Sequence, residues 1–397
     1  MAEWIECSIG DLCDTISDTY KGNDEYVVLV NTSDVLEGKV LNHETVANKN
    51  LKGQFKKTFK RDDILYSEIR PANKRFAYID FENTSNYIAS TKLMVLRHNE
   101  KVLPEYLFAL LKSNYVIAEL QHLAETRSGT FPQITFSSEL APMKVLLPDK
   151  DTQKRIVSIL SSIEQKIDKN NEINNNLLEQ ASTLFNSAIQ QSTSVVYAEL
   201  GSLADVKGGK RLPKGVNLVT TSNQHPYIRV RDLNNTVFAS LSNDYEYVDD
   251  ETQQSISRYI VSTGDLLISI VGTIGLTAIV DHTLNKANLT ENCVKLTNLK
   301  NVTPEYLLLF LRSSQGVEAI SKGTVGAVQL KLPIKNIQSF AVPLLCDEEL
   351  LPLNETLSAI FSQISVNIVE MKQLADIRDT ILPKLMSGEF DVSGINL

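Results

Sequence analysis

The sequence predicts an α/β (α+β) fold in which two similar globular domains are separated by two long antiparallel coiled-coil helices. The decapeptide PEYLFALLKS at 104–113 returns as PEYLLLFLRS at 304–313, and other segments return in the same order. Each copy is followed by a seven-residue apolar repeat, which is typical of helices that pair with other helices. These observations indicate a pseudo-twofold internal repeat.

The repeat extends well beyond the decapeptide, at a nearly constant offset. The further pairs are 26–34 with 227–235, 63–69 with 265–271, 92–97 with 292–297, and SGT with Gln133 against KGT with Gln329. A period of this length exceeds that of a solenoid unit, so it indicates two copies of a whole domain.

Each copy begins with short strands and continues into a helix. Residues 27–30, 64–66, 76–79 and 93–96 are rich in β-branched and aromatic side chains, which favours strands. Pro104 suits the first turn of a helix, where its missing N–H would have no partner. The apolar spacing of the decapeptide predicts that it packs in the core and marks the domain without carrying chemistry. The uncharged run 266–280 is too short to span a membrane and contains two glycines, so we expect two strands around a turn.

Two segments carry mostly apolar side chains at alternating steps of four and three, a pattern interrupted by a few polar residues. On the first segment these positions are Ile156, Leu160, Ile163, Ile167, Asn170, Asn174, Leu177, Ala181, Leu184 and Ala188. On the second they are Leu353, Leu357, Ile360, Ile364, Asn367, Met371, Leu374, Arg378, Ile381 and Leu385. A narrow apolar seam needs another helix to cover it, and a polar residue in the seam fixes the register. We therefore assign register roles to the three seam asparagines, Asn170, Asn174 and Asn367.

The first of these helices spans about 35 residues, or roughly 50 Å. Pairing of the two helices within one chain would hold the globular domains apart, like a ruler. Pairing of each helix with another chain is the alternative. The predicted boundaries are 1–148 for the first globular domain, 149–194 for the first long helix, 195–345 for the second globular domain, and 346–397 for the second long helix with the C-terminal tail.

The net charge of −9 argues against a nucleic-acid partner, but the charge is unevenly distributed. Residues 49–75 contain nine basic residues and three acids, and residues 207–231 contain six basic residues and no acid. Either patch alone would fit an ordinary solvated surface. Their recurrence in both halves favours two equivalent contacts with a nucleic acid.

The basic side chains divide into two groups of candidates for DNA binding. Phosphate contacts, which position a protein without reading sequence, are assigned to Lys52, Lys56, Lys57, Lys60, Arg61, Lys207, Lys210, Arg211 and Lys214. Contacts to base edges, which need side chains such as Arg, Asn, Gln or Lys, are assigned to Arg70, Asn73, Lys74, Arg127, Arg229, Arg231, Lys322 and Gln329.

No catalytic or metal motif accounts for these patches. GGKRLPKG at 208–215 lacks the spacing of a phosphate-binding P-loop, and neither a G-x-S-x-G nor an [ND]-P-P-[YF] motif occurs. The pattern PD with EQK at 148–149 and 164–166 resembles nuclease carboxylates, but its second part lies on the heptad helix. The cysteines lack zinc spacing, and no signal peptide is predicted. We expect a non-catalytic chain that binds no metal and resides in the cytoplasm, away from membranes.

Several of these segments together resemble a known family. They are KRDDILYSEIRPANKRFAYI at 60–79, GKRLPKG at 209–215, YIRVRDLN at 227–234, the helical stretch 142–168, and DIRDTILPKLMSGEFDV at 376–392. Over essentially the whole chain, the sequence resembles the specificity (S) subunit of type I restriction-modification systems.

The resemblance implies a function for each part. The two globular domains would be target recognition domains that read a bipartite, asymmetric site in double-stranded DNA. The helix pair would space them and dock two modification (methyltransferase) subunits, which bind S-adenosylmethionine and methylate adenine. Restriction (translocase and nuclease) subunits would add chemistry that uses ATP and Mg²⁺, while this chain itself binds no cofactor. A protein-binding assembly scaffold without DNA readout is the alternative.

Overall fold

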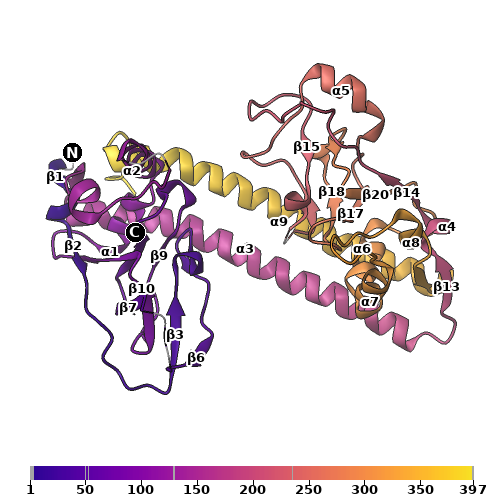
Figure 1. Ribbon diagram of the computed structural model, residues 1–397, viewed down its shortest axis with the longest axis horizontal. Coiled ribbons are helices and arrows are strands. Elements are labelled where there is room, and N and C mark those ends of the chain that lie inside the picture. Colours follow the sequence, from indigo (N-terminus) through magenta and orange to yellow (C-terminus); the bar gives the residue numbers. More distant parts are fainter. Residues whose placement is uncertain (1–3, 50, 52, 128–129, 235, 396–397) are drawn as a thin grey trace. The chain divides into compact units, whose positions relative to one another are not determined.

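The computed structural model describes residues 4–49, 51, 53–127, 130–234 and 236–395. The chain forms two compact units (Figure 1). Unit 1 comprises Met1–Lys169 and Glu370–Leu397, and unit 2 comprises Asn170–Val369. Each unit contains a globular part and a portion of each of two long helices, α3 (Lys150–Gln191) and α9 (Asp347–Ser387).

Unit 1 is built on two four-stranded sheets. One has the order β2 (Cys13–Ile16), β11 (Leu93–His98), β8 (Ile64–Ser67) and β9 (Phe76–Tyr78). The other has the order β6 (Thr45–Ala47), β3 (Tyr26–Val30), β10 (Tyr87–Ser90) and β7 (Phe55–Lys57). The remaining elements are the strand pairs β1 (Trp4–Ser8) with β12 (Lys144–Pro148) and β4 (Val35–Leu36) with β5 (Lys39–Val40), and the helices α1 (Pro104–Leu111) and α2 (Asn114–Arg127).

Unit 2 repeats this plan with changes. Its main sheet has the order β14 (Asp205–Gly208), β20 (Cys293–Thr297), β17 (Leu266–Ser269), β18 (Thr277–Val280) and β16 (Phe238–Ala239). The other strands pair as β13 (Val196–Glu199) with β21 (Ala341–Leu344) and β15 (Tyr227–Ile228) with β19 (Asn288–Leu289). The shorter helices are α4 (Leu200–Leu203), α5 (Asp250–Ile256), α6 (Pro304–Arg312), α7 (Ser314–Gly323) and α8 (Ile334–Gln338).

The strand orders confirm the predicted repeat. Strands β2, β11, β8 and β9 of unit 1 correspond to β14, β20, β17 and β18 of unit 2, with the same antiparallel pairing. A parallel pair follows in each copy, β3 with β10 and β15 with β19. The run 266–280 forms two strands around a glycine turn, as its sequence predicted.

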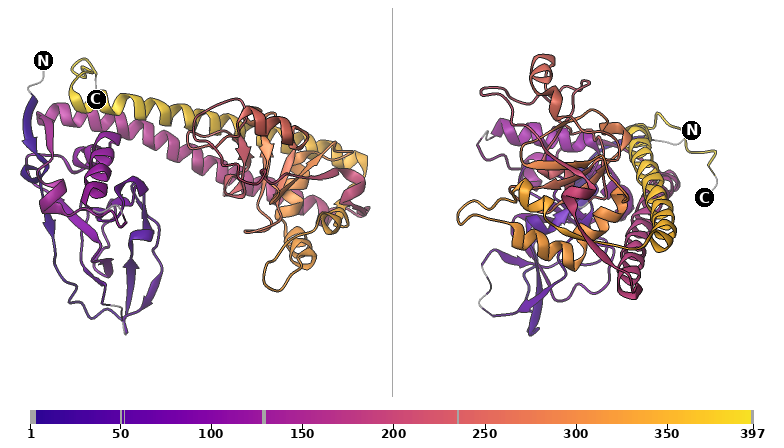
Figure 2. Two further views of the ribbon diagram at one scale, coloured as in Figure 1. Left: turned by 45° about the horizontal axis from the view of Figure 1, so that its top comes forward. Right: turned by 90° about the vertical axis from the view of Figure 1, so that its right-hand side faces the viewer.

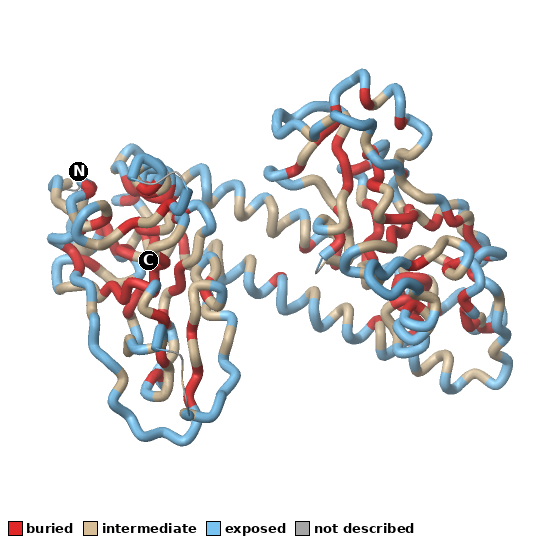
Figure 3. Tube along the Cα trace, viewed as in Figure 1, coloured by how far each residue is buried: buried red, intermediate tan, exposed pale blue. Residues whose placement is uncertain are grey.

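The repeated decapeptide is core, as expected. It forms α1 and α6, and each helix begins at its proline. Tyr106 and Tyr306 are fully buried, and the buried positions of each unit concentrate in the sheets and the helices that cover them (Figure 3). The two copies are therefore alike where they pack.

Within each unit the portions of α3 and α9 lie side by side and antiparallel (Figure 2). In unit 1, Ile156 and Leu160 of α3 share a core with Leu385 of α9. In unit 2 the seam differs from the predicted one, because Leu184 is 41% exposed whereas Phe185 is buried against Tyr306, with ring centroids 4.9 Å apart. A straight helix drifts from a strict heptad, and here α3 must cover α6 as well as α9.

The three seam asparagines lie in unit 2, and two of them bond to each other. Asn367 Nδ2 donates to Asn174 Oδ1 at 2.8 Å, and Gln363 Nε2 donates to Asn367 Oδ1 at 2.8 Å. Asn170 is 1% exposed and Asn367 is 6% exposed. A buried amide that loses its partner destabilises the fold, so this contact supports the register role, which stays a prediction.

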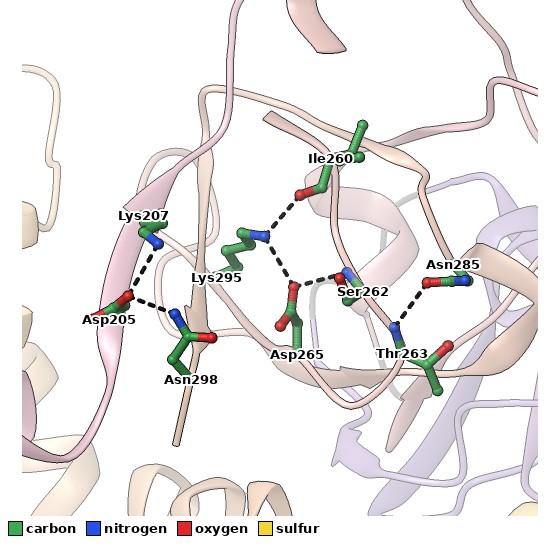
Figure 4. Close-up of polar contacts among 9 residues, drawn as sticks. All are labelled: Asp205, Lys207, Ile260, Ser262, Thr263, Asp265, Asn285, Lys295 and Asn298. Carbon is green, nitrogen blue, oxygen red and sulfur yellow. Dashed lines mark hydrogen bonds and ion pairs between the residues drawn. The ribbon is translucent and has the colours of Figure 1, made fainter. Parts of the chain in front are cut away.

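A buried aspartate organises the start of the central strand in each copy. Asp63, before β8, accepts the N–H of Lys60 at 2.8 Å and both guanidinium contacts of Arg97 at 2.7 Å. Asp265, before β17, accepts the N–H of Ser262 at 2.8 Å and lies 3.2 Å from Lys295 Nζ (Figure 4). Equivalent turns in the two copies are therefore held by the same type of contact.

We predict that Asp63→Ala lowers the free energy of unfolding by about 3 kcal/mol, because it removes a buried carboxylate and leaves the partly buried Arg97 without its partner. Urea denaturation of the full chain measures this. Lys154→Ala, which breaks an exposed pair with Asp151 at 3.4 Å, is the control and should cost less than about 1 kcal/mol. Equal effects of the two variants would contradict a structural role for Asp63.

Candidate nucleic-acid interface

The first-domain phosphate candidates differ in how accessible they are. Lys56 and Lys60 are exposed, and neither side chain has an ion pair among the residues that the structure describes. Lys57 is half-buried on β7, where its Nζ donates to Leu93 O at 2.8 Å and burial lowers its pKa. Arg61 pairs with Glu82 at 2.6 Å. Lys52 lies outside the described residues.

The first-domain base candidates lie in two places. Arg70, Asn73 and Lys74 belong to one turn between β8 and β9, and Lys74 pairs there with Glu37 at 3.5 Å. Arg127, at the end of α2, contacts Glu139 at 3.1 Å.

In the second domain, three of the four phosphate candidates contact neighbouring side chains. Lys207 lies 3.0 Å from Asp205, whose pKa is lowered by the hydrogen bond from Asn298 and then by Lys207 (Figure 4). Arg211 pairs with Glu291 at 2.7 Å. Lys210 Nζ lies 5.5 Å from the centroid of the Tyr259 ring. The fourth candidate, Lys214, is exposed and has no ion pair within the described part of the chain.

Arg229 and Arg231 meet at a cluster of acids. Arg229 forms an ion pair with Glu246, and Arg231 lies 3.6 Å from Glu246 and 3.4 Å from Asp232. Burial raises the pKa of Asp232 to about 6. This cluster holds the 3-10 turn that follows β15, so the arginines have a structural role whether or not they also reach DNA.

The remaining candidates lie toward the end of the second globular part. Lys322 pairs with Glu318 on α7 at 2.6 Å, and Gln329 is exposed in the loop that follows. The proposed match of Gln133 with Gln329 is wrong by two residues. Isolated β-bridges join Ile69 to Gln133 and Val271 to Lys331, so Lys331 is the residue equivalent to Gln133.

Sequence reasoning missed the tip of this loop. Val328 is fully exposed and Leu330 is 54% exposed, beside Gly326 at φ +116°. In the sequence the available signal was a glycine within a short stretch of mostly apolar residues. The candidates that are exposed and lack a side-chain partner among the described residues are Lys56, Lys60, Arg70, Asn73, Lys214 and Gln329.

The nuclease-like pattern has structural contacts instead of a metal site. Asp149 caps α3 by accepting the N–H of Thr152 at 2.9 Å, Glu164 pairs with Lys112, and Lys166 lies 3.4 Å from Glu370. The described residues contain no group of three side chains able to hold a metal ion. Across the same residues, no helix has the length and apolarity needed to cross a membrane.

A family model described as the type I restriction modification DNA specificity domain matches residues 1–179 and 194–375. This chain belongs to that family. The predicted type I specificity subunit, with its repeated α/β domains, is confirmed, and the family describes a specificity domain, in agreement with a non-catalytic chain.

One curated relative agrees with the family assignment. The chain is 29% identical over 465 residues to the type I restriction enzyme HindI specificity subunit of Haemophilus influenzae, covering 98% of this chain and 100% of that protein. The crystal structure of a type I S subunit from M. genitalium has 16% identity, covers 97% of this chain and 96% of its own, and aligns with a TM-score of 0.52, which shows the shared fold. The HsdS subunit of Thermoanaerobacter tengcongensis aligns over 98% of this chain and 97% of its own, with 19% identity and a TM-score of 0.42.

We predict that Lys210→Ala combined with Arg211→Ala weakens DNA binding about equally for all sequences and lowers the salt slope by about one for each phosphate that is no longer neutralised. Binding isotherms over a salt series measure the slope. Lys335→Ala, which removes a lysine from α8, is the control and should leave the slope unchanged. An unchanged slope for the double variant would show that this loop does not contact the phosphates.

We predict that Asp232 makes unit 2 less stable as pH rises. Its folded-state pKa of about 6 lies above the value of about 3.9 for an exposed aspartate. Its stabilising contribution is therefore fully present below about pH 4 and is lost as pH rises through about 6. Asp232→Asn should gain about 2 kcal/mol relative to the parent between pH 4 and pH 7.5, measured by urea denaturation at each pH. A difference that does not change with pH would contradict this.

Proposed function

We propose that each globular part of this specificity subunit contacts one half of a bipartite, asymmetric site in double-stranded DNA. The observation that carries the proposal is a duplicated core whose loops differ. The two copies share strand order and core helices, but their exposed, unpaired polar side chains stand at different positions. Equivalent scaffolds with different loops suit two half-sites of unlike sequence.

The exposed cations support an electrostatic contribution from each copy. Lys56 and Lys60 in the first copy and Lys214 in the second are free to approach phosphates. Lys210, Arg211 and Lys207 would have to exchange their present partners for phosphate oxygens. Such an exchange costs little at the surface, because an exposed ion pair contributes at most about 1 kcal/mol.

The long helices and their surroundings would dock the partner subunits. Exposed apolar side chains on them are Ile173, Leu184, Leu351, Val366, Val369 and Ile377. In unit 1 a mostly apolar pocket of about 530 Å³ adds Tyr115, Leu146 and Met386 to this kind of surface. We assign these surfaces to two modification subunits and to restriction subunits, within a cytoplasmic complex. S-adenosylmethionine, ATP and Mg²⁺ would be held by those partners.

Each of the predicted segments can be assigned a function. Residues 1–148 and 195–345 would be the two target recognition domains. Residues 149–194 and 346–397 would be the spacer helices, the second with the C-terminal tail. A scaffold that binds only proteins is disfavoured by the family assignment, since the matched family is a DNA specificity domain. A gel shift of the chain with and without modification subunits separates the two functions.

We predict that cells expressing this chain with its modification subunits methylate adenine within a two-part motif. Replacing 1–148 by the corresponding domain of another specificity subunit should change one half of the motif, and replacing 195–345 should change only the other. Methylome sequencing measures both. A continuous motif, or one in which either exchange alters both halves, would overturn the proposal.

A further inference from the structure

The start of the turn between two neighbouring strands of the main sheet can be aligned in the two copies, although the turn of unit 1 is one residue longer. Ser67 N–H donates to Arg75 O at 2.8 Å, and Ser269 N–H donates to Leu276 O at 2.9 Å. One residue further, the carbonyl of Glu68 accepts the N–H of Ile134, as the carbonyl of Ile270 accepts that of Leu332. Bridges at Ile69 and Val271 continue the match. Position 70 in unit 1 is therefore position 272 in unit 2.

At this position the chain has a left-handed backbone in both copies, but the residues differ. Gly272 has φ +80°, a conformation that glycine adopts without strain. Arg70 has φ +46°, where a Cβ atom crowds the following carbonyl oxygen. In the second copy a glycine, the residue best suited to this conformation, stands at the equivalent position. Unit 1 nevertheless has an arginine here, which indicates that the side chain itself is needed.

The rest of the unit 1 turn is fixed by contacts with the scaffold. Pro71 is buried, and Ala72 N–H donates to Gln121 Oε1 of α2 at 3.0 Å. Lys74 pairs with Glu37, and Arg75 Nη1 donates to Ser33 O at 3.0 Å. Arg70 N–H donates to Pro132 O at 3.1 Å. The backbone of the turn is held from several sides before any ligand binds.

Two side chains of this turn make no polar contact with the scaffold among the residues described. Arg70 and Asn73 are exposed, and neither has a side-chain hydrogen bond or ion pair among the residues described. The other first-domain base candidates, Lys74 and Arg127, are each paired with a glutamate. The turn thus presents one guanidinium and one carboxamide on a rigid support.

We propose that Arg70 and Asn73 are the specificity-determining side chains of the first half-site, and that Lys74 and Arg127 position the surface around them. Arginine binds O6 and N7 of guanine with two hydrogen bonds, and asparagine binds N6 and N7 of adenine in the same way. A side chain whose support is already ordered loses less entropy on binding. This inference rests on the proposed function and adds to it the residues that discriminate bases.

The test uses Arg70→Gly in the full chain assembled with its modification subunits. Glycine relieves the left-handed backbone, so the temperature of unfolding should stay the same or rise while the side chain is removed. The measured quantity is relative affinity for DNA duplexes in which each base pair of the wild-type site is replaced in turn. We expect discrimination at one G·C pair of the first half to fall about 10- to 100-fold, with the second half unchanged. Asn73→Ala should do the same at one A·T pair.

Lys286→Gly is the matched control. Lys286 is an exposed lysine at φ +69° in unit 2, so this change also removes one cation and relieves a left-handed backbone. It should leave discrimination unchanged at every position. If the wild-type complex discriminates both halves and Arg70→Gly and Asn73→Ala retain that discrimination, the inference is overturned and the proposed function stands. If the wild-type complex discriminates neither half, the proposed function itself fails.

Discussion

The apolar seams of α3 and α9 constrain the whole chain, because neither globular part is completed by adjacent sequence alone. In unit 1 the core formed by the first domain and the start of α3 also contains Leu382, Leu385 and Val392 from the far end of the chain. In unit 2 the end of α3 packs with the start of α9, where Phe185 and Phe361 are buried. Burial of this apolar surface provides the main driving force for bringing the end of the chain back to unit 1.

The duplicated core and the divergent loops follow different physical rules. Close packing limits what can replace a buried tyrosine such as Tyr106 or Tyr306, so the decapeptide keeps its pattern in both copies. The buried aspartates Asp63 and Asp265 are equivalent, yet their cations come from different positions on the facing strand, Arg97 and Lys295. Both copies retain the turn and its buried aspartate. The position of the cation that pairs with the aspartate differs between them.

Acidic residues from other parts of the sequence neutralise several cations of the candidate interface. A basic run predicts positive potential, but the structure pairs Arg61 with Glu82, Arg211 with Glu291 and Arg229 with Glu246. These acids lie well away in the chain from the cations that they contact. Among the described residues, fewer cations are therefore unpaired than the sequence suggested. This favours the exposed Arg70 and Asn73 of one turn as contacts for DNA.

The internal repeat, four strands of the first copy, the helix starts at Pro104 and Pro304, and the family could be predicted from the sequence, because they are visible in local periodicity and in recurring segments. The sequence pattern predicted the helices that carry the seam asparagines, but it assigned Leu184 to the seam in place of Phe185. A heptad describes contact with one partner helix, whereas α3 packs against both α9 and α6. Which cations are paired, and the left-handed backbone that Arg70 shares with Gly272, became visible only in the three-dimensional structure. Those facts depend on contacts between residues far apart in the chain, which no local pattern encodes.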